Sequence, residues 1–248
     1  MLRKASGTAA MNLNVLCIKW GNKFSADYVN KLYNMVRRNL ALPCRFVCLT
    51  DNSAGLNPGI DTADLHGGFD YCWNKLELFR PGLFSGEDVC LYFDLDVVIT
   101  APLDDLVLFQ PQDSFVGLHD WYRSRVPRYN SSVMRFKSGA HTVLYDSLRA
   151  KLADGRVRWA REYDEYLRSN DKVVLWEGEK RYAGDQEWIS HYVYPPKELK
   201  KHSFPGGWIL SYRKHGRRRL PRTCKVMVFH GDPKPHEVNN DYVAEHWR

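Results

Sequence analysis

Long hydrophobic runs are absent from this sequence of 248 residues. Its longest apolar stretches, such as VCLYF and VMVF, are far shorter than the roughly 18 residues that a membrane-spanning helix needs. The first residues, MLRKASGTAA, carry early positive charge but lack the continuous apolar segment of a secretory signal. The sequence therefore predicts no transmembrane helix, and we expect residues 1–12 to form a disordered lead.

Paired cysteine motifs are also absent. The six cysteines are scattered without a C-x-x-C pair. Three of them, Cys17, Cys48 and Cys90, fall in strand-like apolar runs, and cysteine is among the residue types that are most often buried. We therefore expect buried free thiols, which are typical of a reducing, cytoplasmic setting.

Internal repeats and low-complexity linkers are missing as well. With 44% hydrophobic and 26% charged residues, the composition excludes a disordered or fibrous chain. The length suffices for one large α/β domain with a substantial core. We therefore expect residues 13–248 to form a single domain.

Acidic residues are absent from the segment RKHGRRRLPR, residues 213–222, which holds six lysines and arginines. Most of the formal net charge of +7 is therefore local. Three interpretations remain open: a solvated basic loop, a peripheral contact with anionic lipid at the inner face of the membrane, and a site for a phosphorylated acceptor. Because the sequence has no recognition helix, finger or RNA-binding aromatic signature, we expect no nucleic-acid partner.

Strands and helices alternate along the first part of the sequence. LNVLCIK, residues 13–19, is an apolar, β-rich run, Ser25 can cap a helix to about residue 40, and a second strand starts at Arg45. This order implies a βαβ unit and a parallel sheet. Further along, the spacing predicts a loop at 51–70, a helix at 71–79, strands at 89–96 and 115–120, helices at 138–154 and 159–169, a strand from 225 and a short C-terminal helix.

Two aspartates, Asp94 and Asp96, are separated by a single residue in the apolar run LYFDLDVVIT. A buried strand of a parallel sheet delivers its carboxyl end to the crevice where such sheets bind ligands. Residues two apart on a strand share a face, so the two carboxylates would repel each other by about 4 kcal/mol at roughly 4 Å. A divalent cation, Mn²⁺ or Mg²⁺, removes that cost. Solvated acids at a strand end remain the alternative.

The stretch VFHGDPKPH, residues 228–236, closes the last predicted strand. His230 stands at the strand end, Gly231 allows a close approach of the backbone to a ligand, and Lys234 lies between two prolines. A neutral imidazole can complete the ligand set of a metal, while a lysine and backbone amides can hold phosphate oxygens. The alternative is an ordinary turn with its His and Lys facing solvent.

Taken in order, these segments resemble the retaining glycosyltransferases of family 8, relatives of glycogenin and of bacterial lipopolysaccharide galactosyltransferases. LNVLCIKWGN is similar to the family's first strand and uridine-binding loop, LYFDLD to its Y-x-D-x-D motif, YNSSVM to its F-N-x-G-V segment, AGDQ to its D-Q pair, and GDPKP to its G-x-x-K-P loop. The resemblance covers residues 13–240. It implies a single α/β domain of the nucleotide-diphospho-sugar transferase type (GT-A, Rossmann-like), with a mostly parallel central sheet.

The resemblance also implies roles for individual residues. Mn²⁺ or Mg²⁺ would be held by Asp94, Asp96 and His230. Asp185 and Gln186 would be catalytic, beside the donor sugar. The residues implied to bind the nucleotide-sugar are Ile18, Lys19, Trp20, Lys75, Asp120, Asn130, Gly231 and Lys234.

Two positions depart from the family pattern. The family's metal histidine lies three residues before the glycine of the G-x-x-K-P loop, where this chain has Val228, whereas His230 lies one residue before it. Positions two apart on a strand face the same way, so His230 is expected to serve after a small shift. In addition, Ser132 replaces the glycine of the F-N-x-G-V segment, which forms the pocket floor.

The reaction implied by the resemblance is transfer of a hexose from UDP-galactose or UDP-glucose to a hydroxyl of a glycan or glycolipid acceptor. The anomeric configuration would be retained, and the product would be lipopolysaccharide or another cell-surface glycan. Two alternatives remain open. A phosphatase of the haloacid dehalogenase type would use Asp94 as nucleophile, since DLDVV also satisfies its D-x-D-x-[TV] motif, although that motif normally opens the domain. A non-catalytic nucleotide-sugar-binding protein would use the same site without turnover.

Overall fold

The computed structural model describes residues 12–121, 128–163 and 171–248. Its helices are α1 (Ala26–Asn39), the 3₁₀ helix η1 (Tyr71–Phe79), α2 (Asp104–Leu108), α3 (Val143–Ala153), α4 (Asp185–Val193), the π-type turn η3 (Tyr212–Gly216), the 3₁₀ turn η4 (Pro235–Glu237) and α5 (Asp241–His246). Its strands are β1 (Leu13–Lys19), β2 (Arg45–Thr50), β3 (Asp61–Ala63), β4 (Val89–Phe93), β5 (Val97–Ile99), β6 (Phe115–His119), β7 (Tyr129–Lys137), β8 (Val157–Tyr163), β9 (Asp171–Glu177), β10 (Lys180–Tyr182), β11 (Ile209–Ser211) and β12 (Val226–Val228).

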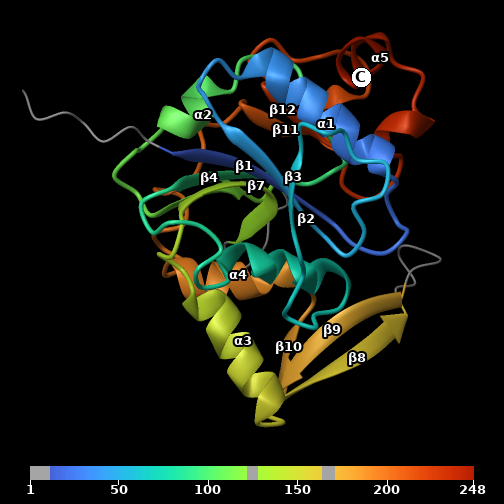
Figure 1. Cartoon of the computed structure of the whole chain (residues 1–248). Coiled ribbons are helices and arrows are strands. Elements are labelled where there is room, and N and C mark those ends of the chain that lie inside the picture. The colour runs from blue at the N-terminus through green and yellow to red at the C-terminus, as the bar shows by residue number, and fades with distance from the viewer. Residues whose placement is uncertain (1–11, 122–127, 164–170) are drawn as a thin grey trace, which may run out of the picture.

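A six-stranded sheet forms the centre of the structure, in the order β3-β2-β1-β4-β7-β6 (Figure 1). β1 pairs in parallel with β2 and β4, and β2 pairs in parallel with β3. β7 runs antiparallel to both β4 and β6. Helix α1 connects β1 to β2 as a crossover, so the predicted βαβ unit and the mostly parallel sheet are confirmed.

Two hydrophobic cores cover the two faces of this sheet. Along β1, Val15 and Cys17 enter the first core with α1, β5 and β12, whereas Leu16 and Ile18 enter the second core with η1, α3 and α4. Figure 1 shows α1 on one side of the sheet and α4 on the other. Burial on both faces explains why the strand runs are apolar throughout.

A three-stranded sheet in the order β11-β12-β5 lies beside the end of β4. β5 follows β4 after the turn at residues 94–96 and pairs antiparallel with β12, so that Val97 stands opposite Val228. Beyond this pair, the backbone amide of Phe229 donates to the carbonyl of Asp96 at 2.9 Å. The pairing therefore holds the loop that follows β12 next to the turn between β4 and β5.

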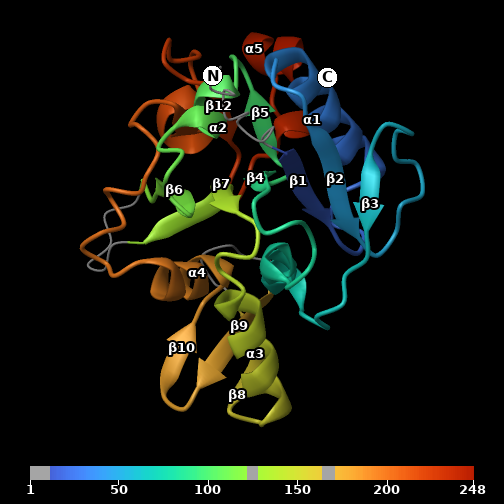
Figure 2. The same ribbon diagram turned by 60° about the vertical axis from the view of Figure 1, so that its left-hand side comes forward.

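The prediction of a helix at 159–169 is wrong. Residues up to Tyr163 belong to strand β8, which pairs with β9 in a three-stranded sheet with β10, away from the central sheet (Figure 2). Positions 164–169 lie outside the described residues. The ring of Trp159 lies 5.2 Å from that of Trp73 on η1. Packing of alternate β8 side chains therefore overrides the helical spacing of the sequence.

Other differences from the sequence predictions are smaller. The expected loop at 51–70 contains the short strand β3, the helix at 71–79 is of the 3₁₀ type, and the helix expected at 138–154 begins only at Val143. Ser25 is the N-cap residue of α1 but makes no capping hydrogen bond with its side chain. Strand β7 was not predicted, although it carries the YNSSVM segment.

All six cysteines lie among the described residues, and each is a free thiol. Burial raises the pKa of the Cys17 and Cys90 thiols, which keeps them protonated and unreactive. None of the helices in the described ranges is long and apolar enough to cross a membrane.

Gly117 on β6 is a position where any side chain would disturb the fold. A Cβ atom there would lie 2.5 Å from the ring of Tyr129, which is fully buried. We therefore expect Gly117→Ala to lower the free energy of unfolding by about 1–3 kcal/mol, as overpacking of a core does. Gly86→Ala is the control, because a Cβ at Gly86 meets no atom within 4 Å. Urea denaturation measures both, and equal stability of the two variants would contradict this account.

Candidate functional site

The ends of four strands meet at one edge of the central sheet. Because β7 is antiparallel to β4, its first residues lie beside the end of β4, and the amide of Asp94 donates to the carbonyl of Ser132 at 2.8 Å. β1 ends next to β4, and the loop after β12 is held against the β4–β5 turn. A cavity of about 260 Å³ opens at this edge. Its lining residues are Ile18, Trp20, Lys23, Phe24, Cys72, Lys75, Tyr92, Asp94, Leu95, Asp96, Asn130, Ser131, Ser132, Asp185, Gln186, His230, Gly231 and Lys234.

Eleven of the thirteen residues proposed from the sequence line this cavity. The two exceptions are Lys19 and Asp120, both of which are buried elsewhere. On β1, alternate residues face opposite sides of the sheet, so Ile18 and Lys19 cannot both face the cavity. The Lys19 ammonium points instead to the carbonyl of Asn52, 3.5 Å away.

Asp120 is separated from the cavity by its own ion pair. The guanidinium of Arg128 lies 2.8 Å from the Asp120 carboxylate and 3.3 Å from that of Glu187, in the first turn of α4. The Glu187 carboxylate also accepts from the amide of Ala183 at 2.7 Å. In this structure, Asp120 therefore joins the end of β6 to α4.

The sequence predicted the two aspartates on a strand, but in the structure they lie in a turn. β4 ends at Phe93, and β5 begins at Val97 in a different sheet, so the chain must turn at Asp94-Leu95-Asp96. Strand alternation therefore does not set the directions of these two carboxylates. Both carboxylates nevertheless line the same cavity, as expected.

Asp94 is held as a carboxylate by groups on three elements. The Lys75 ammonium lies 2.8 Å from its Oδ1, and the Tyr92 hydroxyl donates to the same oxygen at 2.6 Å. Burial alone raises the pKa of Asp94, but the charge of Lys75 and hydrogen bonds from Lys75, Tyr92 and Ser132 outweigh it and lower the pKa. Asp94 is therefore ionised at neutral pH despite its burial.

Asp96 has the opposite balance. Its Oδ2 is 2.5 Å from the ammonium of Lys234. Burial raises the pKa of Asp96, the Lys234 charge opposes that effect, and repulsion from Asp94 adds to it, so that the pKa stays above its usual value. The repulsion between the two acids, which the sequence analysis anticipated, is thus present in the structure.

Asp185 and Gln186 enter the cavity from the start of α4. The Ser131 hydroxyl donates to the Asp185 carboxylate at 2.5 Å, and the Ser131 amide donates to Oε1 of Gln186 at 3.3 Å. The Lys75 ammonium lies 3.3 Å from Asp185 and also donates to the Ser131 hydroxyl at 2.8 Å. Asp185 lies in the first helical turn, but its contacts are with β7 and η1 and not with the helix backbone.

His230 lies on the cavity as a neutral imidazole. Burial and the nearby charge of Arg213 lower its pKa to about 4, although Asp120 acts in the opposite direction. Its Nε2 is 2.6 Å from the Ser211 hydroxyl, and its ring stacks on Trp121 at 5.4 Å.

The expectation that Val228 and His230 face the same way does not hold. β12 ends at Val228, whose side chain is fully buried in the first core, while His230 follows the strand end and lines the cavity. Strand alternation requires an extended chain and stops where the strand stops.

The residues present fit a hard divalent cation that is shared with a ligand. Asp94, Asp96 and His230 line one cavity, but in the described part of the chain no three His, Cys, Asp or Glu side chains gather closely enough to hold a metal alone. Mg²⁺ is commonly bound by one or two protein carboxylates together with substrate phosphates and water. The pair Asp94 and Asp96 matches that type of site.

The formal charges of the cavity balance in the free protein. Three carboxylates and three ammonium groups line it, and His230 is neutral. A divalent cation bound together with an anionic ligand would keep that balance.

Several lining residues were missed by the sequence analysis. Lys23 and Phe24 come from the same loop as Trp20, and Cys72 precedes Lys75 on η1. Ser131 was inside a quoted segment but had no assigned role. Only Tyr92 had a usable signal, because it is the tyrosine of the Y-x-D-x-D pattern.

The chain has a mixed α/β fold with a central, mostly parallel sheet, which matches the GT-A fold of its structural neighbours. No family model and no curated protein matches the sequence. Solved structures of three glycosyltransferases are similar in fold. The galactosyltransferase LgtC, in complex with donor and acceptor sugar analogues, has a TM-score of 0.51 at 13% identity, and the match covers 94% of this chain and 96% of LgtC.

The two other glycosyltransferases are longer than the part that matches. The apo form of GlyE from Streptococcus pneumoniae TIGR4 has a TM-score of 0.60 at 15% identity, with 96% of this chain and 61% of GlyE covered. The bifunctional glycosyltransferase WbbM has a TM-score of 0.56 at 13% identity, with 97% and 50% covered. Because these identities are low, the likeness establishes the fold alone.

Lys75→Met removes the cation that pairs with both Asp94 and Asp185 while keeping a side chain of similar volume. We expect the free energy of unfolding to fall by about 3–5 kcal/mol, because buried carboxylates lose their partner. Lys201→Met is the control, since Lys201 pairs with Glu198 at the surface and should change stability little. Urea denaturation at pH 7 measures both. A Lys75→Met variant as stable as the control would show that the cluster does not depend on this cation.

Proposed function

We propose that this chain is a metal-dependent glycosyltransferase that moves a hexose from a UDP-sugar to an acceptor hydroxyl, with retention at the anomeric carbon. One observation carries the proposal: eleven residues with expected roles toward metal, nucleotide and sugar line a single cavity at the carboxyl edge of a parallel sheet. Such edges are where α/β proteins bind ligands. The fold shared with LgtC, GlyE and WbbM supports the proposal, although a fold by itself does not fix a function.

Breaking the bond between the sugar and the diphosphate leaves negative charge on the diphosphate. Asp94 and Asp96 would hold Mn²⁺ or Mg²⁺, which would supply Lewis-acid stabilisation of that charge. Lys234 donates to the diphosphate oxygens, and Gly231, at φ 69°, lets the backbone come close to them. In the free protein, Asp96 already holds Lys234 at the cavity. On binding of the donor, the Lys234 ammonium therefore only exchanges a carboxylate partner for a phosphate partner.

Asp185 and Gln186 act on the sugar side of the cavity. Ser131 fixes both side chains, through its hydroxyl and its amide. A fixed carboxylate beside the anomeric carbon stabilises the positive charge that builds there. One of the similar solved structures is an active-site mutant of LgtC in which a glutamine is replaced by glutamate. In this chain, we assign the corresponding role to Gln186.

Substrate classes follow from the same proposal. The donor is UDP-galactose or UDP-glucose, and the acceptor is a glycan or glycolipid. The product belongs to lipopolysaccharide or another cell-surface glycan, assembled from the cytoplasmic side of the membrane. The structure of LgtC with donor and acceptor sugar analogues supports the pairing of two sugar sites in this fold.

UDP release from UDP-galactose and UDP-glucose tests the proposal. We expect release to require Mn²⁺ or Mg²⁺ and to fall about a hundredfold or more in Asp96→Asn, since Lewis-acid stabilisation is worth several kcal/mol. Asp61→Asn, which changes an exposed acid on β3, is the control and should leave release unchanged. Thermal shift with UDP provides a second measurement, because UDP should raise the melting temperature more in the presence of Mn²⁺.

Different results would point to the alternatives. Release of phosphate from simple monoesters, lost in Asp94→Asn, would favour the phosphatase. Metal-dependent binding of UDP-sugars without any UDP release would favour the non-catalytic binding protein. Absence of both UDP binding and UDP release would overturn the glycosyltransferase proposal.

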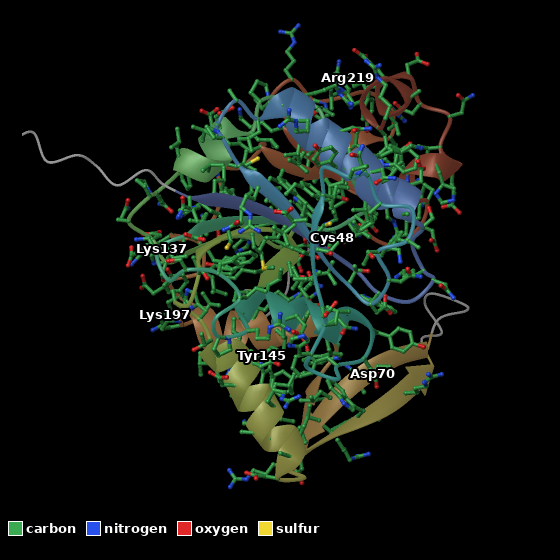
Figure 3. All side chains as sticks on the ribbon, in the orientation of Figure 1. Cys48, Asp70, Lys137, Tyr145, Lys197 and Arg219 are labelled. Atoms are coloured by element: carbon green, nitrogen blue, oxygen red, sulfur yellow. The ribbon has the colours of Figure 1, made fainter. Side chains whose placement is uncertain are left out.

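The distal part of the basic segment is a second region with a proposed partner. Arg217, Arg218, Arg219 and Arg222 are all exposed. Figure 3 places Arg219 near α5, at the end of the molecule opposite to β8–β10. We propose that these arginines make a peripheral contact with anionic lipid at the inner face of the membrane, since each basic residue near such a surface contributes about 1 kcal/mol.

Vesicle sedimentation tests the membrane contact. We expect the chain to bind vesicles that contain phosphatidylglycerol and to dissociate as salt rises, since exposed charges are screened over about 8 Å at physiological ionic strength. The triple variant Arg217→Gln, Arg218→Gln, Arg219→Gln should bind more weakly. Equal binding to neutral phosphatidylcholine vesicles would remove the membrane contact from the proposal.

A further inference from the structure

Arg213, the first residue of the basic segment, lies at the rim of the cavity and not with the distal arginines. It is the second residue of η3. This turn directly follows Ser211, whose hydroxyl contacts His230. A Cβ atom built on Gly231 would lie 3.0 Å from Nη1 of Arg213, so the guanidinium rests against that glycine. Gly231 and His230 line the cavity, whereas Arg213 does not.

The Arg213 guanidinium has no anionic partner in residues 12–121, 128–163 and 171–248. No carboxylate of these ranges forms an ion pair with it, and no side chain or carbonyl there accepts a hydrogen bond from it. Most cations around the cavity differ in this respect, since Lys75 pairs with Asp94 and Lys234 pairs with Asp96. A half-buried guanidinium with five donors and no acceptor indicates a place for an anion.

An aromatic surface lies beside this guanidinium. Trp121 is half-buried and stacks on His230 at 5.4 Å, with its indole nitrogen donating to the carbonyl of Ile209 at 3.2 Å. The Lys214 ammonium donates to the carbonyl of Trp121 at 2.7 Å, which places a second cation at the rim. Aromatic faces with a few placed polar groups are the usual lining of small-molecule sites.

The position of this group selects the acceptor over the donor. A donor diphosphate must lie inside the cavity, within reach of Asp94, Asp96 and Lys234. Arg213 does not belong to that lining, although its guanidinium lies against Gly231, which does. A second substrate that approaches the cavity from solvent passes the rim, where Trp121 and Arg213 lie.

We infer that the acceptor is an anionic saccharide whose phosphate or carboxylate is bound by Arg213, with a sugar ring against Trp121. This inference rests on the proposed glycosyltransferase function and adds the chemical class of the acceptor. Arg213 forms paired N–H bonds with the anion, which is the geometry that guanidinium offers to phosphate and carboxylate. Trp121 orients the ring so that a hydroxyl faces the cavity.

Isothermal titration of the full chain with simple sugars tests the anion site without any turnover. We expect glucose 1-phosphate, glucose 6-phosphate or glucuronate to bind about tenfold or more tightly than glucose. A gain in affinity of this size is what a hydrogen bond to a charged group provides. Arg213→Gln should bring the anionic and neutral sugars to the same affinity, and Arg213→Lys should retain part of the preference. Arg217→Gln, which removes an exposed arginine of the same segment, should retain it in full.

Three results would overturn the inference. One is that none of the anionic sugars binds more tightly than glucose. Another is that Arg217→Gln removes the preference as completely as Arg213→Gln, because the cause would then be the general positive field. The third is that Arg213→Gln weakens UDP binding by the same factor as sugar phosphate binding, because Arg213 would then serve the donor. Melting temperatures of all variants check that each is folded.

Further arms separate this inference from the other proposals. Competition by phosphatidylglycerol vesicles for the sugar phosphate, with no effect of Arg213→Gln on sugar binding, would assign the residue to the membrane contact and overturn the inference. If the wild-type chain releases no UDP, the proposed function is overturned, whereas the sugar titration still reports on anion binding by Arg213. With both intact, anionic acceptors should stimulate UDP release more than glucose, and only in chains that keep Arg213.

Discussion

The buried ammonium of Lys75 is the interaction on which the site depends. It contacts the carboxylates of Asp94 and Asp185 and the hydroxyl of Ser131, and these come from the end of β4, the start of α4 and the start of β7. Burial lowers the pKa of a lysine, but here the two carboxylates outweigh burial and raise it, so the cation persists. One charge thereby fixes the positions of Asp94 and Asp185 relative to each other on the cavity wall.

The rest of the cavity follows from the same electrostatic constraint. Asp96 pairs with Lys234 from the loop after β12, which the Phe229–Asp96 backbone bond brings within reach. In the free site, Asp94 and Asp185 therefore share Lys75, whereas Asp96 pairs with Lys234. Under the proposed function, a bound diphosphate and cation would replace these partners without leaving an unpaired buried charge, which is the costly state in a site of low dielectric. Charges placed in advance in this way would need little rearrangement during the proposed reaction.

The sequence predicted what depends on local patterns. Apolar runs predicted four of the six strands of the central sheet, β1, β2, β4 and β6, and the paired aspartates and the His-Gly segment marked residues that line its edge. What it could not predict depends on partners from distant segments. Asp120 leaves the cavity because Arg128 and Glu187 hold it, and Trp159 sits on a strand because Trp73 packs against it. The direction of Lys19 follows from the alternation of β1, which can be read from the sequence.

The structure also separates site residues whose positions the strands fix from residues outside the strands, which can be substituted more freely. Asp94, Asp96 and their lysines are set by strand pairing on both sides of the β4–β5 turn, so their positions follow from two hydrophobic cores. Arg213 in the turn η3 and Trp121 in the loop after β6 lie outside that lining, where a substitution changes no strand register. Function that differs between proteins of one fold is expected in such loops, which a rigid scaffold positions. Under the two proposals, the donor end of the cavity would therefore be fixed by the fold, whereas the acceptor end could vary with the chemistry of its substrate.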